Sequence, residues 1–164
     1  MKTLKRRRKE NKTDYSNRIK FLKSGKPRIV FRKTNKYVIA QYVISKQAQD
    51  KIVIGLSSKI LLKYGWPKEL DGSLKSISAS YLLGLLIGKK IIKEKLESPI
   101  IDFGMIRSLH KTKIYGFLKG LIDAGVEIKC SKETFPDENQ IKGKYMIEDF
   151  SKIFETVKSK VETE

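Results

Sequence analysis

A chain of 164 residues with 40% hydrophobic residues can form one domain with a buried core, and its formal net charge of +18 is unusually high. Its longest apolar run, residues 81–87, is far shorter than the ~20 residues of a membrane-spanning helix, and the N-terminus has no apolar signal segment, so we expect a cytoplasmic protein without a membrane partner. One cysteine and one histidine exclude an intramolecular disulfide and a zinc finger, so we also expect no metal and no cofactor.

The positive charge is concentrated at the N-terminal end. Residues 1–36 contain 15 Lys and Arg against two acids, whereas residues 37–164 contain 21 against 16. No Asp or Glu occurs between Tyr15 and Gln49. Such a block of like charge repels itself unless a polyanion covers it. The distribution therefore favours nucleic acid as the partner.

Residues 1–27 predict a basic N-terminal arm with a short helix. The run KRRRK opens the segment 5–12, which has almost no apolar residue, and we expect this segment to be disordered until RNA binds it. Asp14 is a suitable N-cap residue and Gly25 a suitable C-terminal stop, so the helix is predicted between them.

The next segment predicts an antiparallel meander of three strands. The strands are expected over residues 28–34, 37–45 and 51–58, with a polar turn at 34–36. Ile29 and Phe31 alternate with polar neighbours, so they are predicted to anchor the first hairpin to the core while its arginines face solvent.

The pattern then changes to helices that alternate with short apolar runs. We predict a helix at 76–96 with Ser76 or Ser78 as its N-cap, and a second helix at 112–125. We also predict a buried, parallel strand at 99–104, a fifth strand at 126–129 and a terminal helix at 146–161. The prediction is an α/β domain with a mixed sheet and packed helices. Its RNA-binding part spans residues 28–130, and residues 131–164 form a C-terminal extension with a net charge of −2, suited to a protein partner. The helical G-x-x-x-G spacings predict a close approach of helix to sheet, at Gly84, Gly88, Gly116 and Gly120.

No catalytic constellation is present in the sequence. His110 lies in a basic loop with no acid nearby, and there is no phosphate-binding glycine motif. The element order matches ribonuclease-H-like nucleases, which hold two metal ions through several carboxylates. The first two predicted strands carry no acid, and Asp102 is alone. We therefore expect no enzyme. Two alternatives remain, namely a nucleic-acid-processing enzyme on this scaffold and a generic basic RNA-binding module.

Residues 12–41, KTDYSNRIKFLKSGKPRIVFRKTNKYVIAQ, resemble the start of the large-subunit ribosomal protein family that binds 5S ribosomal RNA, family eighteen of the bacterial scheme. Later segments resemble further family motifs in the same order: ASYLLGLLIGKK (79–90), IIDFG (100–104), FLKGLIDAGVEI (117–128) and FPDENQIKG (135–143), the last typical of the archaeal and eukaryotic branch. Two departures are Thr34, where Ser is usual, and KTKIYG (111–116), which replaces a usual Gly-Ser-Arg.

The resemblance implies a ribonuclease-H-like domain without nuclease activity, whose hairpin and arm lie on RNA. The function it implies is a structural constituent of the large ribosomal subunit that docks 5S rRNA onto the large-subunit rRNA, beside neighbouring ribosomal proteins. Cations would meet phosphates, amides would meet 2′-hydroxyls or base edges, and Tyr37 would stack on an unpaired base. The predicted RNA-binding residues are Arg6, Arg7, Arg8, Lys12, Tyr15, Arg18, Lys23, Lys26, Arg28, Arg32, Lys33, Asn35, Lys36, Tyr37, Gln41, Lys111 and Lys113.

Overall fold

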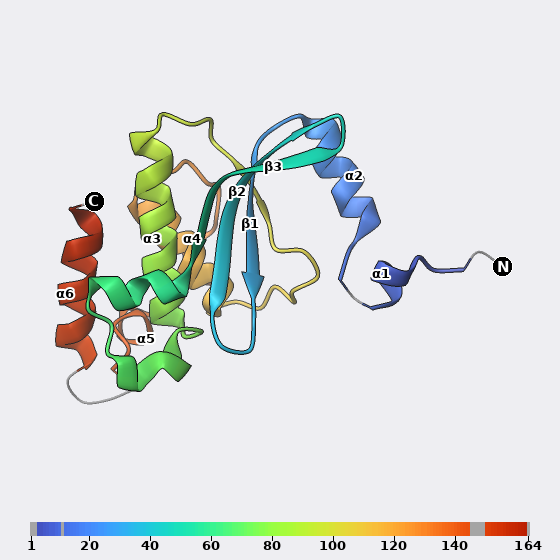
Figure 1. The fold of residues 1–164 in the computed structure, drawn as a ribbon. Coiled ribbons are helices and arrows are strands. Elements are labelled where there is room, and N and C mark those ends of the chain that lie inside the picture. The colour runs from blue at the N-terminus through green and yellow to red at the C-terminus, as the bar shows by residue number, and fades with distance from the viewer. Residues whose placement is uncertain (1–2, 11, 145–149, 164) are drawn as a thin grey trace.

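The computed structural model describes residues 3–10, 12–144 and 150–163 and shows a mixed α/β fold around an open four-stranded sheet (Figure 1). The strand order is β3-β2-β1-β4. The strands are β1 (Arg28–Lys33), β2 (Val38–Lys46), β3 (Gln49–Ser57) and β4 (Ile100–Asp102).

The pairing of the strands confirms the predicted meander and gives one parallel neighbour. β2 is antiparallel to both β1 and β3, whereas β4 is parallel to β1. The predicted fifth strand at residues 126–129 is wrong, because this segment pairs with no strand. The Val126 amide instead donates to the Leu121 carbonyl, and its buried side chain joins the core. The apolar residues that suggested a strand therefore close the end of a helix.

The predicted caps are confirmed at two helices. The Asp14 carboxylate accepts hydrogen bonds from the amides of Ser16 and Asn17, and Ser76 accepts one from Ala79. Two 3₁₀ helices that the sequence did not predict, Ser58–Tyr64 and Lys68–Ser73, connect β3 to the next helix. The first four residues of the predicted terminal helix lie outside the described residues. The α-helices are α1 (Arg6–Lys9), α2 (Tyr15–Ser24), α3 (Ile77–Lys93), α4 (Lys113–Asp123), α5 (Glu138–Ile141) and α6 (Phe150–Glu162).

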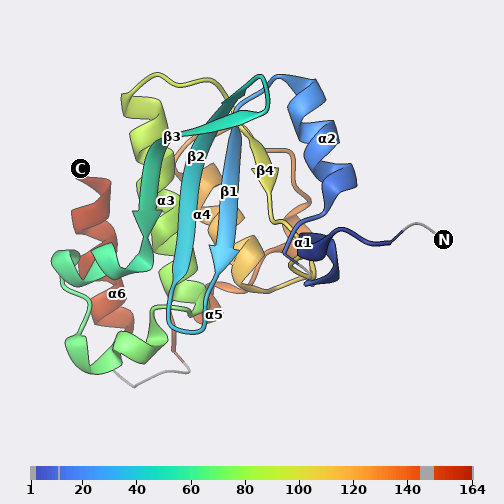
Figure 2. The same cartoon turned by 45° about the vertical axis from the view of Figure 1, so that its right-hand side comes forward.

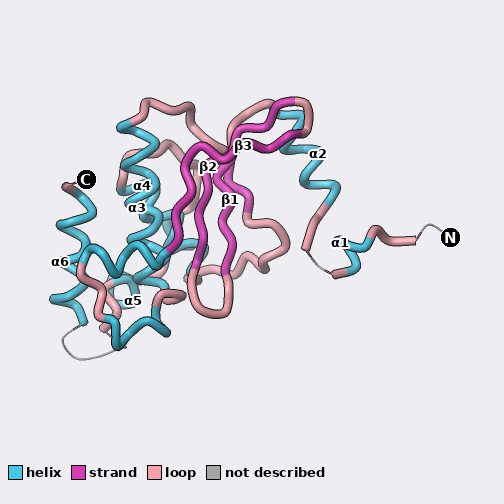
Figure 3. The backbone as a smooth tube through the Cα atoms, viewed as in Figure 1, coloured by secondary structure: helices cyan, strands magenta, loops and turns pink. Residues whose placement is uncertain are grey.

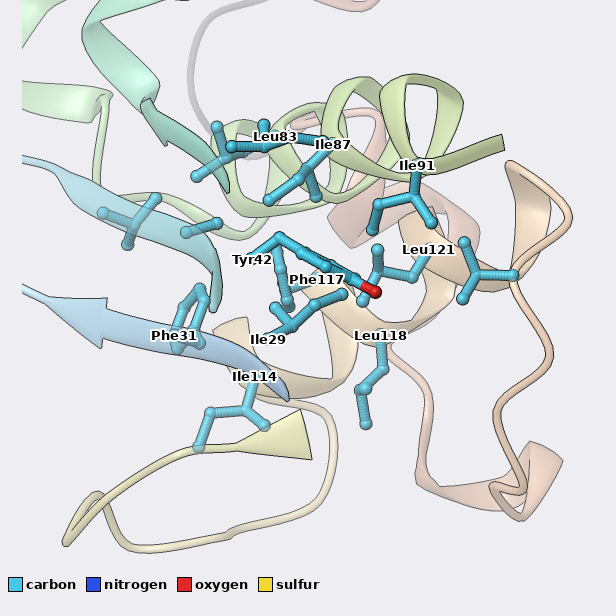
Figure 4. Packing of buried hydrophobic residues seen from close by; sticks show 14 residues of the cluster. Ile29, Phe31, Tyr42, Leu83, Ile87, Ile91, Ile114, Phe117, Leu118 and Leu121 are labelled. Carbon is cyan, nitrogen blue, oxygen red and sulfur yellow. The ribbon is translucent and has the colours of Figure 1, made fainter. Parts of the chain in front are cut away.

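Helices cover one face of the sheet only. Figure 2 shows α3 and α4 behind β1 and β2, with α2 beyond the β4 edge, and Figure 3 shows α3 and α4 on one side of the strands and α2 on the other. The core on the covered face joins sheet residues such as Phe31 and Tyr42 to Leu83 of α3 and Phe117 of α4 (Figure 4). A second core, outside α3, is formed with α6 and includes Trp66, Leu82, Phe150, Phe154 and Val157. The opposite sheet face is left without a covering helix among the described residues.

The helical glycines lie between α3 and α4, rather than against the sheet as predicted. A Cβ atom on Gly120 would lie 2.1 Å from the Tyr81 carbonyl oxygen, and one on Gly84 would lie 2.2 Å from the Phe117 carbonyl oxygen. Each helix therefore presents a glycine to the backbone of the other. This close backbone contact lets both helices pack on the same sheet face.

Replacement of Gly120 by alanine tests this contact. Alanine favours a helix by about 1 kcal/mol relative to glycine, but the overlap with α3 forces the helices apart, and we expect a net loss of roughly 1–3 kcal/mol in the free energy of unfolding. Gly72→Ala is the control, since no atom lies within 4 Å of a Cβ atom there. Urea unfolding of both variants measures the effect. Equal stability of the two variants would show that α3 and α4 separate without cost.

Candidate RNA-binding surface

The uncovered face of the sheet, here called the open face, carries every second residue of the strands. Ile29 pairs with Tyr42 and Phe31 with Ala40 on the core side, so the residues between them point away from the helices. Figure 2 shows no helix in front of β1 and β2. The open face comprises Arg28, Val30, Arg32, Ile39, Gln41, Val43, Gly55, Ser57, Ile100 and Asp102. Arg28, Val43 and Asp102 are nevertheless buried there.

Gln41 lies at the middle of the open face. Its neighbour on β1 is Val30 and its neighbour on β3 is Gly55. Gly55 is exposed, and the nearest atom that a Cβ there would meet is a methyl group of Ile52 at 3.5 Å. The missing side chain leaves the half-exposed amide of Gln41 accessible to a ligand backbone. The sequence analysis missed Gly55, although a lone glycine inside a strand is a known signal of close backbone approach.

Arg28 is not available on the open face, and its expected exposure is wrong. The residue is 5% exposed, and its Nη2 atom lies 2.7 Å from the Asp50 carboxylate. The same carboxylate accepts a hydrogen bond from Arg18 of α2 at 3.1 Å and one from the Ser45 hydroxyl at 2.7 Å. Asp50, the first acid after the acid-free window, therefore compensates two of the predicted RNA-binding arginines and ties α2 to the sheet.

Arg32 remains half-exposed, but its guanidinium is fixed by hydrogen bonds to Asp102 of the neighbouring strand β4. Its Nη2 atom donates to the Asp102 carboxylate at 3.2 Å, and its Nη1 atom donates to the Asp102 carbonyl oxygen at 2.9 Å. The second oxygen of this carboxylate accepts the Gly104 amide at 2.7 Å. A side chain at Gly104 would lie against the guanidinium, since a Cβ atom there would be 2.9 Å from the Arg32 Cζ atom. The IIDFG motif thus orients an arginine.

The turn between β1 and β2 presents exposed polar groups on a rigid frame. The Thr34 hydroxyl accepts hydrogen bonds from the amides of Lys36 and Tyr37 and donates to the Tyr37 carbonyl. Asn35 and Lys36 are exposed at its tip. The Tyr37 ring is half-buried, and the Lys59 ammonium lies 4.7 Å from its centroid. A base that stacks on this ring must therefore use the face opposite Lys59.

The arm contains one helical turn, α1, in which no residue is buried. Arg6 and Lys12 pair with Glu10, and Arg8 pairs with Asp14. The Lys5 ammonium lies 4.6 Å from the centroid of the Tyr15 ring. The ordering of residues 5–12 on RNA stays a prediction.

Four of the predicted RNA-binding residues line a small pocket between the arm, α2 and the sheet, namely Arg7, Lys12, Arg18 and Arg32. Asp14 and Asp102 line the same pocket. Lys23 and Lys26 are exposed near the end of α2. The structure does not bring Lys33, Lys111 and Lys113 to the open face. These three line a separate groove at the start of α4.

The described residues contain no group of three His, Cys, Asp or Glu side chains that could hold a metal ion. The Asp102 carboxylate, the one acid placed as in a nuclease strand, is occupied by Arg32 and the Gly104 amide. No helix within residues 3–10, 12–144 and 150–163 is long and apolar enough to cross a membrane.

Comparison with known proteins decides the family. A profile of the family described as ribosomal large subunit proteins 60S L5, and 50S L18 matches residues 1–99. The chain belongs to this family. It is 41% identical over 141 residues to "Large ribosomal subunit protein uL18" of Korarchaeum cryptofilum (strain OPF8), a match that covers 86% of this chain and 70% of the relative. It is 37% identical over 143 residues to the protein of the same name from Methanothermobacter thermautotrophicus, covering 87% and 72%.

The uL18 family match spans the arm, α2, the meander and α3, and so includes all of the open face except its β4 residues. The resemblance that the sequence motifs suggested is therefore confirmed. The assignment of individual RNA-binding residues stays a prediction, now without Arg28.

The ion pairs of Asp50 predict a pH-dependent stability. Burial by itself raises the pKa of Asp50, but the Ser45 hydroxyl, Arg28 and Arg18 together hold this pKa below its ordinary value of 3.8. The stabilisation is thus fully present above pH 3.8 and is lost as the pH falls through the lower folded-state pKa. Asp50→Asn should cost roughly 1–3 kcal/mol of unfolding free energy at pH 7, since it leaves the buried Arg28 poorly compensated.

The measurement is urea unfolding of the wild type and Asp50→Asn between pH 7 and pH 2.5. We expect the difference between them to shrink in acid. Asp71→Asn, at an exposed position of the second 3₁₀ helix, serves as control. A difference that is constant with pH would mean that the charge of Asp50 contributes nothing.

Proposed function

We propose that this uL18-family protein is a structural constituent of the large ribosomal subunit that binds 5S rRNA and helps to dock it onto the large-subunit rRNA. Its partners would be these two RNAs and neighbouring ribosomal proteins, in the cytoplasm. The observation that carries the proposal is the family match over the basic arm and the three meander strands, which form most of the open face. The charge of the chain supports it, since most of the net charge lies within residues 1–36.

The geometry of the open face suits the minor groove of RNA. This groove is wide and shallow and is recognised through its shape, its phosphates and its 2′-hydroxyl groups. A sheet surface with a glycine beside Gln41 can approach such a groove closely, and the Gln41 amide can both donate to and accept from a hydroxyl. Arg32 is oriented in advance by Asp102, so it loses little freedom on binding a phosphate.

The residues around Asp102 do not suit a nucleic-acid-processing enzyme on the same scaffold. Metal-dependent cleavage needs several free carboxylates at one place, and Asp102 is engaged by Arg32. We accordingly propose that the chain does not act as an enzyme.

Co-sedimentation is the experiment that tests the proposed role. A tagged chain expressed in its own cells should migrate with large subunits through a sucrose gradient and should retain 5S rRNA when the subunits are dissociated. Presence only in the soluble fractions would favour an RNA-binding module outside the ribosome. Cleavage of the RNA by the purified chain with Mg²⁺ would favour the enzyme instead.

Gly55→Leu tests whether RNA approaches the open face. The leucine side chain would project beside Gln41 and hold the RNA away, so 5S rRNA affinity should fall by about tenfold, the loss of one or two hydrogen bonds. The net charge is unchanged, and therefore binding to an unrelated RNA duplex should change little. Both affinities are measured at one fixed salt concentration, together with the thermal midpoint.

Gly72→Leu is the matched control, because a Cβ atom there has no neighbour within 4 Å and the position lies in the second 3₁₀ helix, outside the open face. If a folded Gly55→Leu protein binds 5S rRNA as tightly as Gly72→Leu, the open face does not contact this RNA.

A further inference from the structure

A second concave surface lies at the end of β1, beside the start of α4, and is here called the β1–α4 groove. Its volume is about 370 Å³. Five apolar residues from four parts of the chain line it: Phe31 of β1, Ile77 of α3, Ile106 and Leu109 of the loop before α4, and Ile114 of α4. Leu109 is 53% exposed, so its side chain is accessible at the edge of this apolar hollow.

Four cations surround this apolar lining: Lys33, Arg107, Lys111 and Lys113. Lys111 pairs with Asp137 at 3.3 Å. Within the described part of the chain, the other three form no ion pair. Burial lowers the pKa of Lys113, and the charges of Lys33 and Lys75 lower it further. The groove therefore holds three cations without an ion-pair partner next to the exposed Leu109 and the half-buried Ile77 and Ile106.

The loop that carries Leu109 has a defined shape. The Thr112 hydroxyl donates to the Leu109 carbonyl at 2.7 Å, and the Lys111 amide donates to the Thr134 carbonyl at 2.9 Å. Lys111 adopts a φ of 56°, in the left-handed region that favours glycine. The chain thus carries a lysine at a position whose backbone does not favour it, which places one more cation at the groove.

We propose that the β1–α4 groove binds a single unpaired nucleotide of ribosomal RNA, with the base on the apolar lining and the phosphates on the surrounding cations. Any base has an apolar face, and an apolar surface flanked by cations matches the two parts of a nucleotide. The volume is at the lower end of the roughly 300–1,000 Å³ of small-ligand sites, which suits one nucleotide rather than a duplex. The inference rests on the proposed function and adds to it a second RNA contact.

Position in the fold favours RNA over an acidic peptide as the occupant. Lys33 is the last residue of β1, and the exposed turn that follows it carries Asn35 and Lys36. The hairpin therefore connects the groove to the open face. An RNA that covers the open face can continue over this turn, where a flipped-out nucleotide reaches the groove.

Nuclear magnetic resonance on the isolated full chain tests whether a nucleotide fits. The probes are adenosine monophosphate and inorganic phosphate. Adenosine monophosphate should shift the amides of residues 106–114 in a saturable manner and more strongly than phosphate does. Leu109→Ala should weaken this binding about fivefold, through lost apolar contact. Ile92→Ala, another exposed aliphatic residue, on α3, should bind as the wild type does. Equal shifts with both probes, or no shift, would overturn the inference.

Photocrosslinking tests the groove in the native complex. A photoreactive residue replaces Leu109 in chains that are then assembled into large subunits. Ile92 carries the same probe in the control. A crosslink from position 109 to a nucleotide that is unpaired in the rRNA supports the inference. A crosslink to protein or to duplex RNA, or none, refutes it while the chain still sediments with subunits. A chain that never enters subunits refutes the proposed function as well.

Discussion

The close contact between α3 and α4 is the constraint on which the rest of the structure depends. Gly84 and Gly120 bring the two helix backbones together, so both helices fit on one face of a narrow sheet. Their apolar side chains then meet Phe31 and Tyr42 in a single core. Because this packing satisfies the apolar residues of β1 and β2 from one side, the other side needs no helix. The open face is thus a consequence of how the core is built.

Acidic residues near the basic end of the chain have a structural use. Asp14 caps α2, Asp50 compensates Arg18 and Arg28, and Asp102 orients Arg32. Each of the three contacts a specific partner instead of lying free on the surface. Two arginines of β1 pair with carboxylates but differ in exposure. Arg28, which pairs with Asp50, is buried, whereas Arg32, which pairs with Asp102, is half-exposed. Of these two arginines of β1, Arg28 therefore serves the fold, while Arg32 stays accessible for the proposed RNA contact.

The two proposed RNA contacts lie on either side of the β1–β2 hairpin. The open face offers a shallow polar surface around Gln41, whereas the β1–α4 groove offers an apolar hollow among cations. A duplex suits the first surface and an unpaired nucleotide the second. A protein that positions one RNA against another benefits from two surfaces of different chemistry, because simple charge attraction would not distinguish the two RNA segments.

The sequence by itself determined the local structure and the family. Several features depend only on neighbours within a few residues, so they can be predicted from the sequence. They are the alternation in the meander, the caps at Asp14 and Ser76, and the family motifs in their order along the chain. Only the tertiary structure decided which side chains remain available. Arg28 is buried because Asp50 lies across the hairpin from it, Val126 ends a helix instead of starting a strand, and Gly84 meets another helix instead of the sheet. Arg28 and Gly84 meet partners that are distant in sequence, and Val126 packs into a core formed by distant segments, so none of these outcomes follows from a local pattern.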